Sequence, residues 1–352
     1  MNTIHIAASR EYDVLIGHGL LDELGTLAAG VVDAKTAAIV SDDSVFALYG
    51  KRAAAALERA GLRVVSFVFP HGESSKNLTV YGQVLNFLCE NRVSRTDVVV
   101  ALGGGVVGDL AGFAAATYLR GIRFIQVPTT LLAMVDSSVG GKTAVDLDGG
   151  KNQAGAFWQP SLVVCDCDVL DTLPEREYRC GCAEVIKYGL LDNVPFFNDL
   201  MEKPAKEQYE HVISTCVEMK KQVVLSDEFD RGERQKLNLG HTIGHAVEQC
   251  SGFTLLHGEC VAIGMAVITR AAVKKGFCAQ ETLDAVEKIL KLYGLPDKTD
   301  YSADKLLDVA LSDKKVANGN ISLIVPEAVG KCSILPVPAE ALREWMQAGG
   351  IV

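Results

Sequence analysis

Short apolar runs alternate with helical stretches over about the first 170 residues of the chain. The runs are rich in β-branched residues and predict five strands, at residues 37–40, 64–69, 98–102, 124–127 and 162–165. Between them, stretches such as 51–60 and 78–89 have apolar residues at helical spacing. This alternation is typical of βαβ units, so we predict an N-terminal α/β domain with a Rossmann-like, mostly parallel sheet.

Beyond about residue 174 the strand-like runs nearly disappear and helical spacing dominates, apart from a short apolar run at 321–325. Pro174 followed by acidic residues is typical of a helix start, because the first turn needs no proline N–H and favours negative charge. A chain of 352 residues also exceeds one ordinary core. We therefore predict two domains, 1–174 and an all-α domain at 175–352, with the active site in the cleft between them.

Polar residues in the second half recur at helical spacing and would form one stripe on a helix. These residues are Arg234, Asn238, His241, His245 and Glu248. A cation, an amide, two imidazoles and a carboxylate together can bind a metal and an oxygen-rich anion. The competing interpretation is a solvated helix face.

Two glycines within this stripe favour a functional site over a solvent-exposed face. Gly240 and Gly244 are four residues apart and lower the helix propensity of the segment. They also leave room for another backbone or a cofactor to approach.

Composition narrows the class of protein. Hydrophobic residues make up 49% of the chain and charged residues 22%, which is typical of a soluble globular enzyme. The net charge of -10 argues against a nucleic-acid partner, since phosphate backbones bind basic surfaces. The apolar stretch 98–119 contains Asp109 and several glycines, which disfavours a membrane span. We see no secretory signal and expect the ten cysteines to be free thiols in a cytoplasmic protein.

A glycine-rich segment follows the predicted strand 98–102. Gly103 to Gly108 satisfies G-x-G-x-x-G between a strand and a helix, the context in which it binds a pyrophosphate. The usual acidic ribose partner is absent about twenty residues later, at 123–127. Asp42, at the end of an earlier predicted strand, is a candidate for this role, although it could equally be a simple turn residue.

The segment from Asp136 to Thr143 resembles a P-loop, but an aspartate occupies the position of its first glycine, so an NTPase is disfavoured. Lys142, together with Lys151 and Asn152, could still form a cradle for a phosphate or a carboxylate.

His241 and His245 have the spacing of a metalloprotease H-E-x-x-H motif, but Thr242 replaces its glutamate, so peptide hydrolysis is disfavoured. Both histidines could bind a metal, or one could bind it while the other transfers protons. Glu184 and Lys187 lie on one helix face, either in a site or as an ordinary surface ion pair.

Taken in order, these segments resemble the 3-dehydroquinate synthase family, NAD- and zinc-dependent cyclases of the shikimate pathway. The resemblance extends over about residues 42–315 and includes further segments around Glu73 and Lys76, Thr172, His257 and Asp313 to Lys315. It implies zinc, or cobalt, bound by Glu184, His241 and His257, with His245 left to transfer protons or bind substrate.

The resemblance also implies two larger sets of residues. The substrate would be bound by Asp136, Lys142, Asn152, Lys187, Lys220, Arg234, Asn238, His245 and Lys314, with Lys315 an alternative to Lys314. NAD would be bound by Asp42, Glu73, Lys76, Gly103, Gly104, Gly105, Asp109, Thr129, Thr130, Lys142, Lys151 and Thr172. Arg120 would reach the site of a neighbouring subunit in a homodimer. Domain 1–174 would then bind NAD, and domain 175–352 the metal and substrate.

The implied reaction converts 3-deoxy-D-arabino-heptulosonate 7-phosphate into 3-dehydroquinate and phosphate, a step toward the aromatic amino acids. NAD oxidises the substrate transiently, phosphate is eliminated, the hydride returns, and an intramolecular aldol step closes the ring. Ala144 and Asp146 depart from the glycine and asparagine that are commoner in this family. The alternatives are a sister cyclase that acts on an amino analogue, a metal-dependent alcohol or glycerol dehydrogenase, and a catalytically inactive NAD- or metal-binding regulator.

Overall fold

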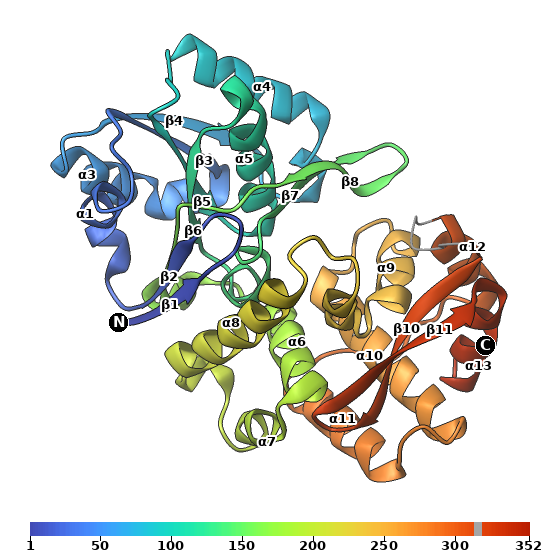
Figure 1. The fold of residues 1–352 in the computed structure, drawn as a ribbon. Helices are drawn as coiled ribbons and strands as arrows, with labels where there is room; N and C mark the ends of the chain where they lie inside the picture. The colour runs from blue at the N-terminus through green and yellow to red at the C-terminus, as the bar shows by residue number, and fades with distance from the viewer. Residues whose placement is uncertain (313–318) are drawn as a thin grey trace. The chain divides into compact units, whose positions relative to one another are not determined.

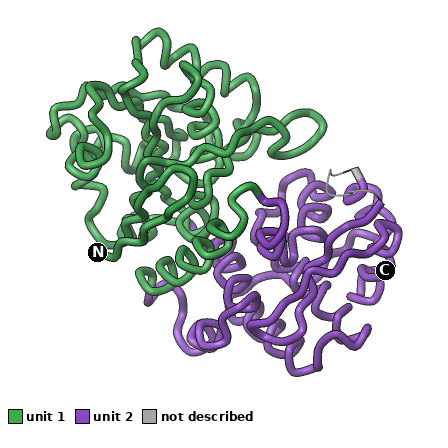
Figure 2. The backbone as a smooth tube through the Cα atoms, in the orientation of Figure 1, with its two compact units in different colours: residues 1–173, 209–229 green, residues 174–208, 230–352 purple. Residues whose placement is uncertain are grey.

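The structure, a computed structural model, describes residues 1–312 and 319–352 and divides them into two compact units. The first comprises Met1–Leu173 and Tyr209–Phe229, and the second comprises Pro174–Gln208 and Asp230–Val352 (Figure 2). The predicted division at 174/175 therefore differs from these units at Pro174 and in one segment, residues 209–229.

A seven-stranded sheet forms the centre of the first unit (Figure 1). Its strands, in spatial order, are β1 (Asn2–Ile6), β2 (Tyr12–Gly17), β9 (Leu162–Asp166), β6 (Arg123–Pro128), β5 (Val98–Gly103), β3 (Thr36–Asp42) and β4 (Arg63–Phe69). All neighbours are parallel except β1 and β2, which form an antiparallel pair. The five predicted strands and the mostly parallel sheet are confirmed, whereas the edge pair β1–β2 was not predicted.

Helices cover the sheet of the first unit. They are α1 (Leu24–Ala29), the single turn α2 (Asp43–Val45), α3 (Lys51–Arg59), α4 (Leu78–Glu90) and α5 (Gly105–Thr117). Buried side chains of α4 and α5 form one core with β3, β5 and β6, and this core includes Leu88, Leu110 and Phe124. Every residue of β3 and β5 is buried, as the central strands of a parallel sheet require.

A second hairpin of the first unit follows the turn at Ala133–Ser137. Its strands, β7 (Lys142–Leu147) and β8 (Gly150–Phe157), pair in antiparallel register (Figure 1). The P-loop-like segment therefore continues into a strand, and the sequence did not predict this hairpin.

Helix α8 (Tyr209–Ser226) belongs to the first unit, although the sequence predicted it in the second. It packs against β1, β2 and the turn at Ala133–Ser137. Val212, Cys216, Lys220 and Val224 recur every four residues and are buried, so one face of α8 lies against this unit. Helical spacing revealed the helix but could not show which unit would cover its apolar face.

The second unit is largely helical. Its helices are α6 (Glu175–Asp192), α7 (Val194–Glu202), α9 (His241–Cys250), α10 (His257–Lys274), α11 (Gln280–Leu292), α12 (Ala303–Ser312) and α13 (Leu342–Ala348). It also contains an antiparallel hairpin of β10 (Asn320–Ala328) and β11 (Lys331–Pro338), longer than the predicted run at 321–325. Within residues 1–312 and 319–352, no helix is long and apolar enough to cross a membrane.

Candidate functional site

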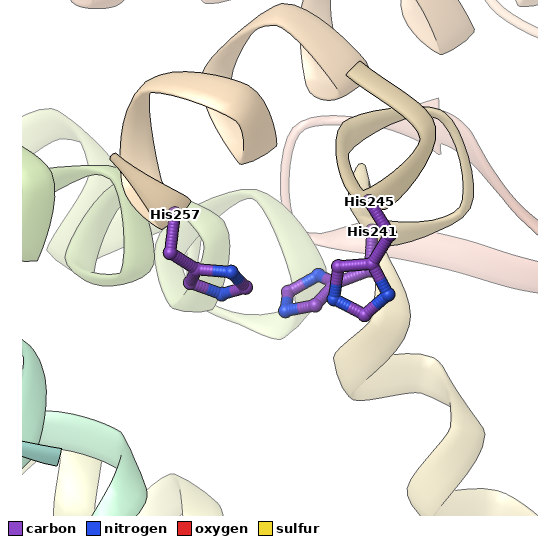
Figure 3. Close-up of side chains that lie close together, drawn as sticks. All are labelled: His241, His245 and His257. Atoms are coloured by element: carbon purple, nitrogen blue, oxygen red, sulfur yellow. The ribbon is translucent and has the colours of Figure 1, made fainter. Parts of the chain in front are cut away.

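Three imidazoles of the second unit converge where helices α9 and α10 begin (Figure 3). His241 is the first residue of α9, His245 lies one turn later, and His257 is the first residue of α10. Ligand nitrogens of the three rings all lie within 4.8 Å of one another. This spacing allows one metal ion to bind two or three of them.

Glu184 of α6 reaches the same group with a fully buried carboxylate. One of its oxygens lies 3.5 Å from Nε2 of His241 and 3.3 Å from Nε2 of His257. Among the described residues, neither oxygen of Glu184 receives a well-directed hydrogen bond. A buried carboxylate without directed hydrogen-bond donors is well suited to a metal ion, because a cation binds its lone pairs. One carboxylate and two imidazoles thus fit a zinc ion.

Lys187 lies one turn along α6 from Glu184, and its Nζ is 2.5 Å from Oε2 of that carboxylate. Both side chains are completely buried, so they do not form the surface ion pair considered as the alternative.

His257 contacts a second carboxylate that the sequence placed in the stripe without a role. Nδ1 of His257 lies 3.5 Å from Oε2 of Glu248, which is 4% exposed. Burial of the ring alone would lower the pKa of His257, but the interactions with Glu184 and Glu248 raise it to about 9.

The predicted stripe is not one continuous helix, and this prediction was wrong. Arg234 and Asn238 lie in a 3-10 segment (Glu233–Asn238), and α9 begins only at His241. Gly240 separates the two, because its φ of +78° is left-handed and interrupts the helix. Arg234 is nonetheless buried, with 2% exposure.

Glycines bring the backbones of α9 and α10 into close contact. A Cβ at Gly244 would lie 2.8 Å from the carbonyl oxygen of Cys260, and one at Gly240 would lie 2.6 Å from that of Val261. The prediction that these glycines admit another backbone is therefore confirmed. The close contact places His241 beside His257.

In the first unit, the glycine-rich segment spans the junction of β5 and α5. β5 ends at Gly103 and α5 begins at Gly105 with no side-chain cap, so the N–H groups of its first turn are suited to bind an anion. Asp42 ends the adjacent strand β3, where its carboxylate accepts a hydrogen bond of 2.9 Å from the N–H of Val45. In this structure Asp42 thus caps the turn α2, and burial raises its pKa.

Three threonines predicted to bind NAD also lie in the first unit. Thr129 is buried, and its hydroxyl oxygen has no hydrogen-bond partner within residues 1–312 and 319–352. A Cβ at Gly104 would lie 3.0 Å from the methyl group of Thr130, so that threonine borders the glycine segment. Thr172 shares a 2.6 Å hydrogen bond with the hydroxyl of Tyr49.

Lys76 connects a predicted cofactor residue with a predicted substrate residue. Its Nζ donates hydrogen bonds of 2.5 Å to Asp109 and to the side-chain oxygen of Asn152. Burial lowers the pKa of Lys76, but nearby carboxylates, Asp109 first among them, raise it overall. Lys151 pairs with Glu73 at 2.8 Å, so five predicted residues form one polar group.

Asp146, one of the departures from the family pattern, shapes this group. Its carboxylate accepts a hydrogen bond of 2.7 Å from the N–H of Asn152, whose φ is +55°. The acidic side chain therefore stabilises the left-handed turn that presents Asn152.

Asp136 and Lys220 meet elsewhere in the first unit. Lys220 of α8 pairs with the Asp136 carboxylate. It also donates a hydrogen bond of 2.5 Å to the backbone carbonyl oxygen of Asp136. Lys142 begins β7 and is exposed, and Arg120 is exposed with a left-handed φ of +67°. Lys314 and Lys315 lie outside the described residues.

Sequence reasoning found no role for Glu248 and did not anticipate the contact of Asp146. The spacing of Glu248 from His241 and His245 was visible, but His257 comes from another helix. A contact across helices has no signature in spacing along one of them.

The glycine-rich loop of a parallel α/β unit and the group of one buried carboxylate and two imidazoles define a candidate dinucleotide- and metal-dependent enzyme. Family models agree with this class: "3-dehydroquinate synthase N-terminal" matches residues 66–180, and "3-dehydroquinate synthase C-terminal" matches residues 181–316. The chain belongs to the 3-dehydroquinate synthase family.

Curated relatives match over almost the whole chain. The 3-dehydroquinate synthase of Streptococcus suis is 42% identical over 343 residues, which cover 96% of this chain and 97% of the relative. That of Lactococcus lactis subsp. cremoris is 43% identical over 345 residues, with the same two coverages.

Solved structures have the same fold. A 2-deoxy-scyllo-inosose synthase complexed with carbaglucose-6-phosphate, NAD+ and Co2+ has a TM-score of 0.87 at 27% identity, covering 98% of this chain and 99% of its own. A 2-epi-5-epi-valiolone synthase from Streptomyces hygroscopicus subsp. jinggangensis, with NAD+ and Zn2+ bound, has a TM-score of 0.87 at 27% identity and 96% coverage of both chains. An iron-containing alcohol dehydrogenase has a TM-score of 0.66 at 16% identity, covering 96% of this chain and 97% of its own, and shares the fold alone.

Proposed function

We propose that this chain converts 3-deoxy-D-arabino-heptulosonate 7-phosphate into 3-dehydroquinate and phosphate. The observation that carries the proposal is the buried carboxylate of Glu184 between His241 and His257, in a chain of this family. The substrate carries two anionic groups, a carboxylate and a phosphate. The proposed substrate-binding residues include the cations Lys142, Lys187, Lys220 and Arg234, which suit such a substrate.

We infer that zinc is bound by Glu184, His241 and His257, and that NAD is bound along the glycine segment of the first unit. When bound, the metal would supply Lewis acidity and NAD would supply reversible hydride transfer. Three imidazoles without Glu184 are the alternative ligand set. The two nitrogen-to-oxygen distances of 3.5 and 3.3 Å favour the set that contains Glu184.

The residues of this chain would bind the substrate and move its protons. Buried Arg234 is suited to bind the carboxylate bidentately, with Asn238 beside it in the same 3-10 segment. Lys142 and Asn152 would bind the phosphate. His245 would accept the proton of the hydroxyl that is oxidised, since a neutral imidazole near neutral pH can accept one.

The test is phosphate release from the heptulosonate phosphate by zinc-loaded protein, with NAD far below the substrate concentration. We expect many turnovers per NAD, loss of activity with a chelator, and recovery with Zn²⁺ or Co²⁺. Release that stops after one equivalent of NAD, or NADH that accumulates, would contradict the proposal and favour an alcohol or glycerol dehydrogenase. Faster turnover of an amino analogue would favour the sister cyclase.

Metal content separates the two ligand sets. We expect His257→Ala to lose bound zinc, and His245→Ala to retain it while turnover slows. Equal loss of zinc from both variants would contradict the assigned roles and favour three imidazole ligands.

We further infer a homodimer in which Arg120 acts in the site of the neighbouring subunit. Leu119 and Arg120 both have positive φ and are exposed, and a Cβ at the following Gly121 would lie 2.5 Å from the ring of Trp158. Trp158 also donates a hydrogen bond of 2.9 Å to the carbonyl oxygen of Ile122, so this turn is firmly anchored.

Mixing two inactive variants tests the shared site. Arg120→Ala and His257→Ala should each be inactive alone, and their mixed dimers should regain activity if Arg120 serves the partner. No recovery in dimers shown to have exchanged subunits would contradict this role.

We infer a cytoplasmic location from the cysteines, all ten of which are free and six of which are buried. Fractionation of cells that express the chain tests this.

A further inference from the structure

Glu248 is not one of the proposed metal ligands, but it lies on the same face of α9 as His241 and His245. It is seven residues after His241, two turns along the helix, and its side chain is 5% exposed. A carboxylate this buried is costly unless it has a partner. Its Oε2 lies 3.5 Å from Nδ1 of His257, so its contact is with a ligand from the next helix.

The two ring nitrogens of His257 face different carboxylates. Nε2 lies 3.3 Å from Glu184, on the side of the proposed metal, whereas Nδ1 lies 3.5 Å from Glu248. In a neutral imidazole only one nitrogen carries the proton, and an ionised carboxylate accepts but cannot donate. When a metal binds Nε2, the ring is neutral and its single proton is on Nδ1, which can donate it to the Glu248 carboxylate.

His241 is oriented in the same way by a different acceptor. Its Nδ1 lies 3.0 Å from the carbonyl oxygen of Leu239, and its Nε2 lies 3.5 Å from Glu184. In both proposed imidazole ligands, Nδ1 thus faces a hydrogen-bond acceptor and Nε2 faces Glu184. The acceptor of His257 carries a charge, which makes the ring a stronger donor to a metal than a neutral acceptor would.

The backbone of His257 is fixed independently of Glu248. Glu259 accepts a hydrogen bond of 2.8 Å from the N–H of Leu256 and further hydrogen bonds from Nε and Nη2 of Arg176 on α6. The N–H of Gly258 lies 3.1 Å from the sulfur of Cys180, also on α6. Since these contacts hold the start of α10 against α6, Glu248 is left to set the orientation of the ring.

We propose that Glu248 is a positioning residue that holds the His257 imidazole, through Nδ1, in the orientation and tautomer that bind the metal. The inference rests on the proposed function, because it assumes that His257 is a metal ligand. It predicts a role in metal affinity that is separate from folding.

The experiment measures zinc affinity of the full chain by competition with a chromophoric chelator, without substrate. We expect Glu248→Ala to weaken zinc binding by about 10–100-fold, the usual effect of removing such a carboxylate. Glu248→Gln keeps an acceptor oxygen and should weaken it less. Gln249→Ala, at the exposed neighbouring position of α9, is the matched control and should bind zinc like the unmodified chain.

Cobalt absorption spectra and thermal unfolding complete the test. With Co²⁺ as the probe, the visible bands should shift in Glu248→Ala and remain unchanged in Gln249→Ala. Lower thermal stability of metal-free Glu248→Ala with unchanged zinc affinity would mean a purely structural ion pair and would overturn the inference. If Glu248→Ala does not fold, unchanged affinity and spectrum in Glu248→Gln would overturn it as well.

The outcome is distinguishable from failure of the proposed function. Zinc binding that depends on Glu248 in a chain that releases no phosphate would sustain this inference and defeat the proposed reaction. Catalytic phosphate release by a chain whose zinc affinity does not change when Glu248 is replaced would support the proposed reaction and contradict this inference.

Discussion

Nζ of Lys187 lies 2.5 Å from Oε2 of Glu184 one helical turn away, and both side chains are completely buried. In the metal-free chain the Lys187 ammonium therefore compensates part of the charge of that carboxylate. Removing one partner of a buried ion pair leaves an uncompensated charge. We expect Lys187→Met to lower the free energy of unfolding of the metal-free chain by about 3–5 kcal/mol. Urea unfolding in the presence of a chelator measures this.

Zinc should reduce this loss, because a bound cation also compensates Glu184. The matched control is Lys203→Met, which removes an exposed lysine of the same unit and should change stability little. If metal-free Lys187→Met had the same free energy of unfolding as the unmodified chain, the Lys187 ammonium would not be what compensates the charge of Glu184.

Gly258, the residue after His257, sets how closely α10 approaches α6. A Cβ at this position would lie 2.0 Å from the carbonyl oxygen of Cys180. We expect Gly258→Ala to move the start of α10, lengthen the contact between Glu184 and His257, and weaken zinc binding by at least about tenfold. The overpacking should also cost about 1–3 kcal/mol of stability. Chelator competition and urea unfolding measure the two effects.

Gly82→Ala is the control for this substitution. Gly82 lies within α4, and a Cβ there would meet no atom within 4 Å. Since alanine is the better helix former, stability should rise by up to about 1 kcal/mol. Zinc affinity in Gly258→Ala equal to that of Gly82→Ala would refute the assigned role of Gly258.

The central strands could be predicted from the sequence because each is buried on both faces and reads as a continuous apolar run. β3 and β5 are examples. The edge pair β1–β2 and the hairpin β7–β8 lack this pattern, and β8 is only partly buried along most of its length. The position of α8 could not be predicted because a helical stripe shows that a face is covered but not which unit covers it.

Only part of the candidate site could be predicted, because spacing shows which residues share one helix face but not which helices meet. Spacing placed His241 and His245 together, and the family resemblance added Glu184 and His257 from two other helices. Spacing also extended the stripe back to Arg234, because the pattern carries no mark of the left-handed φ at Gly240 that interrupts the helix. The contact of Glu248 with His257 depends on the packing of α9 against α10, which periodicity along one helix does not encode.

Asp109 and Lys76 form a buried ion pair in the first unit, with side chains 19% and 5% exposed. We expect Asp109→Asn to keep the shape but to remove the charge that supports the Lys76 ammonium. A hydrogen bond to a charged group contributes about 1.5–3 kcal/mol, so stability should fall by roughly that amount. Urea unfolding measures the loss.

Asp22→Asn is the matched control, because Asp22 pairs with Arg52 at 3.0 Å but both side chains are about half exposed. Exposed pairs contribute at most about 1 kcal/mol. Equal losses in the two variants would show that burial does not set the strength of the Lys76 pair.

His18 links three elements of the first unit and should make its stability depend on pH. Nδ1 of His18 lies 2.5 Å from Asp168, and Nε2 lies 3.3 Å from Glu210 at the start of α8. The hydrogen bond to Asp168 is the main cause that raises the pKa of His18 above 6.5, and the charges of Glu210 and Asp166 add to it. The same hydrogen bond lowers the pKa of Asp168.

A histidine whose pKa is higher in the folded chain stabilises the fold while it is charged. Its contribution is complete below the unfolded pKa of 6.5 and is lost as pH rises through the higher folded pKa. We therefore expect His18→Gln to destabilise the chain at about pH 6 and to have little effect at about pH 9. His18 is 59% exposed, so the loss should stay below about 1 kcal/mol and shrink in high salt. Urea unfolding of both proteins at the two pH values measures it, and an equal or larger loss at the higher pH would contradict the assigned charge.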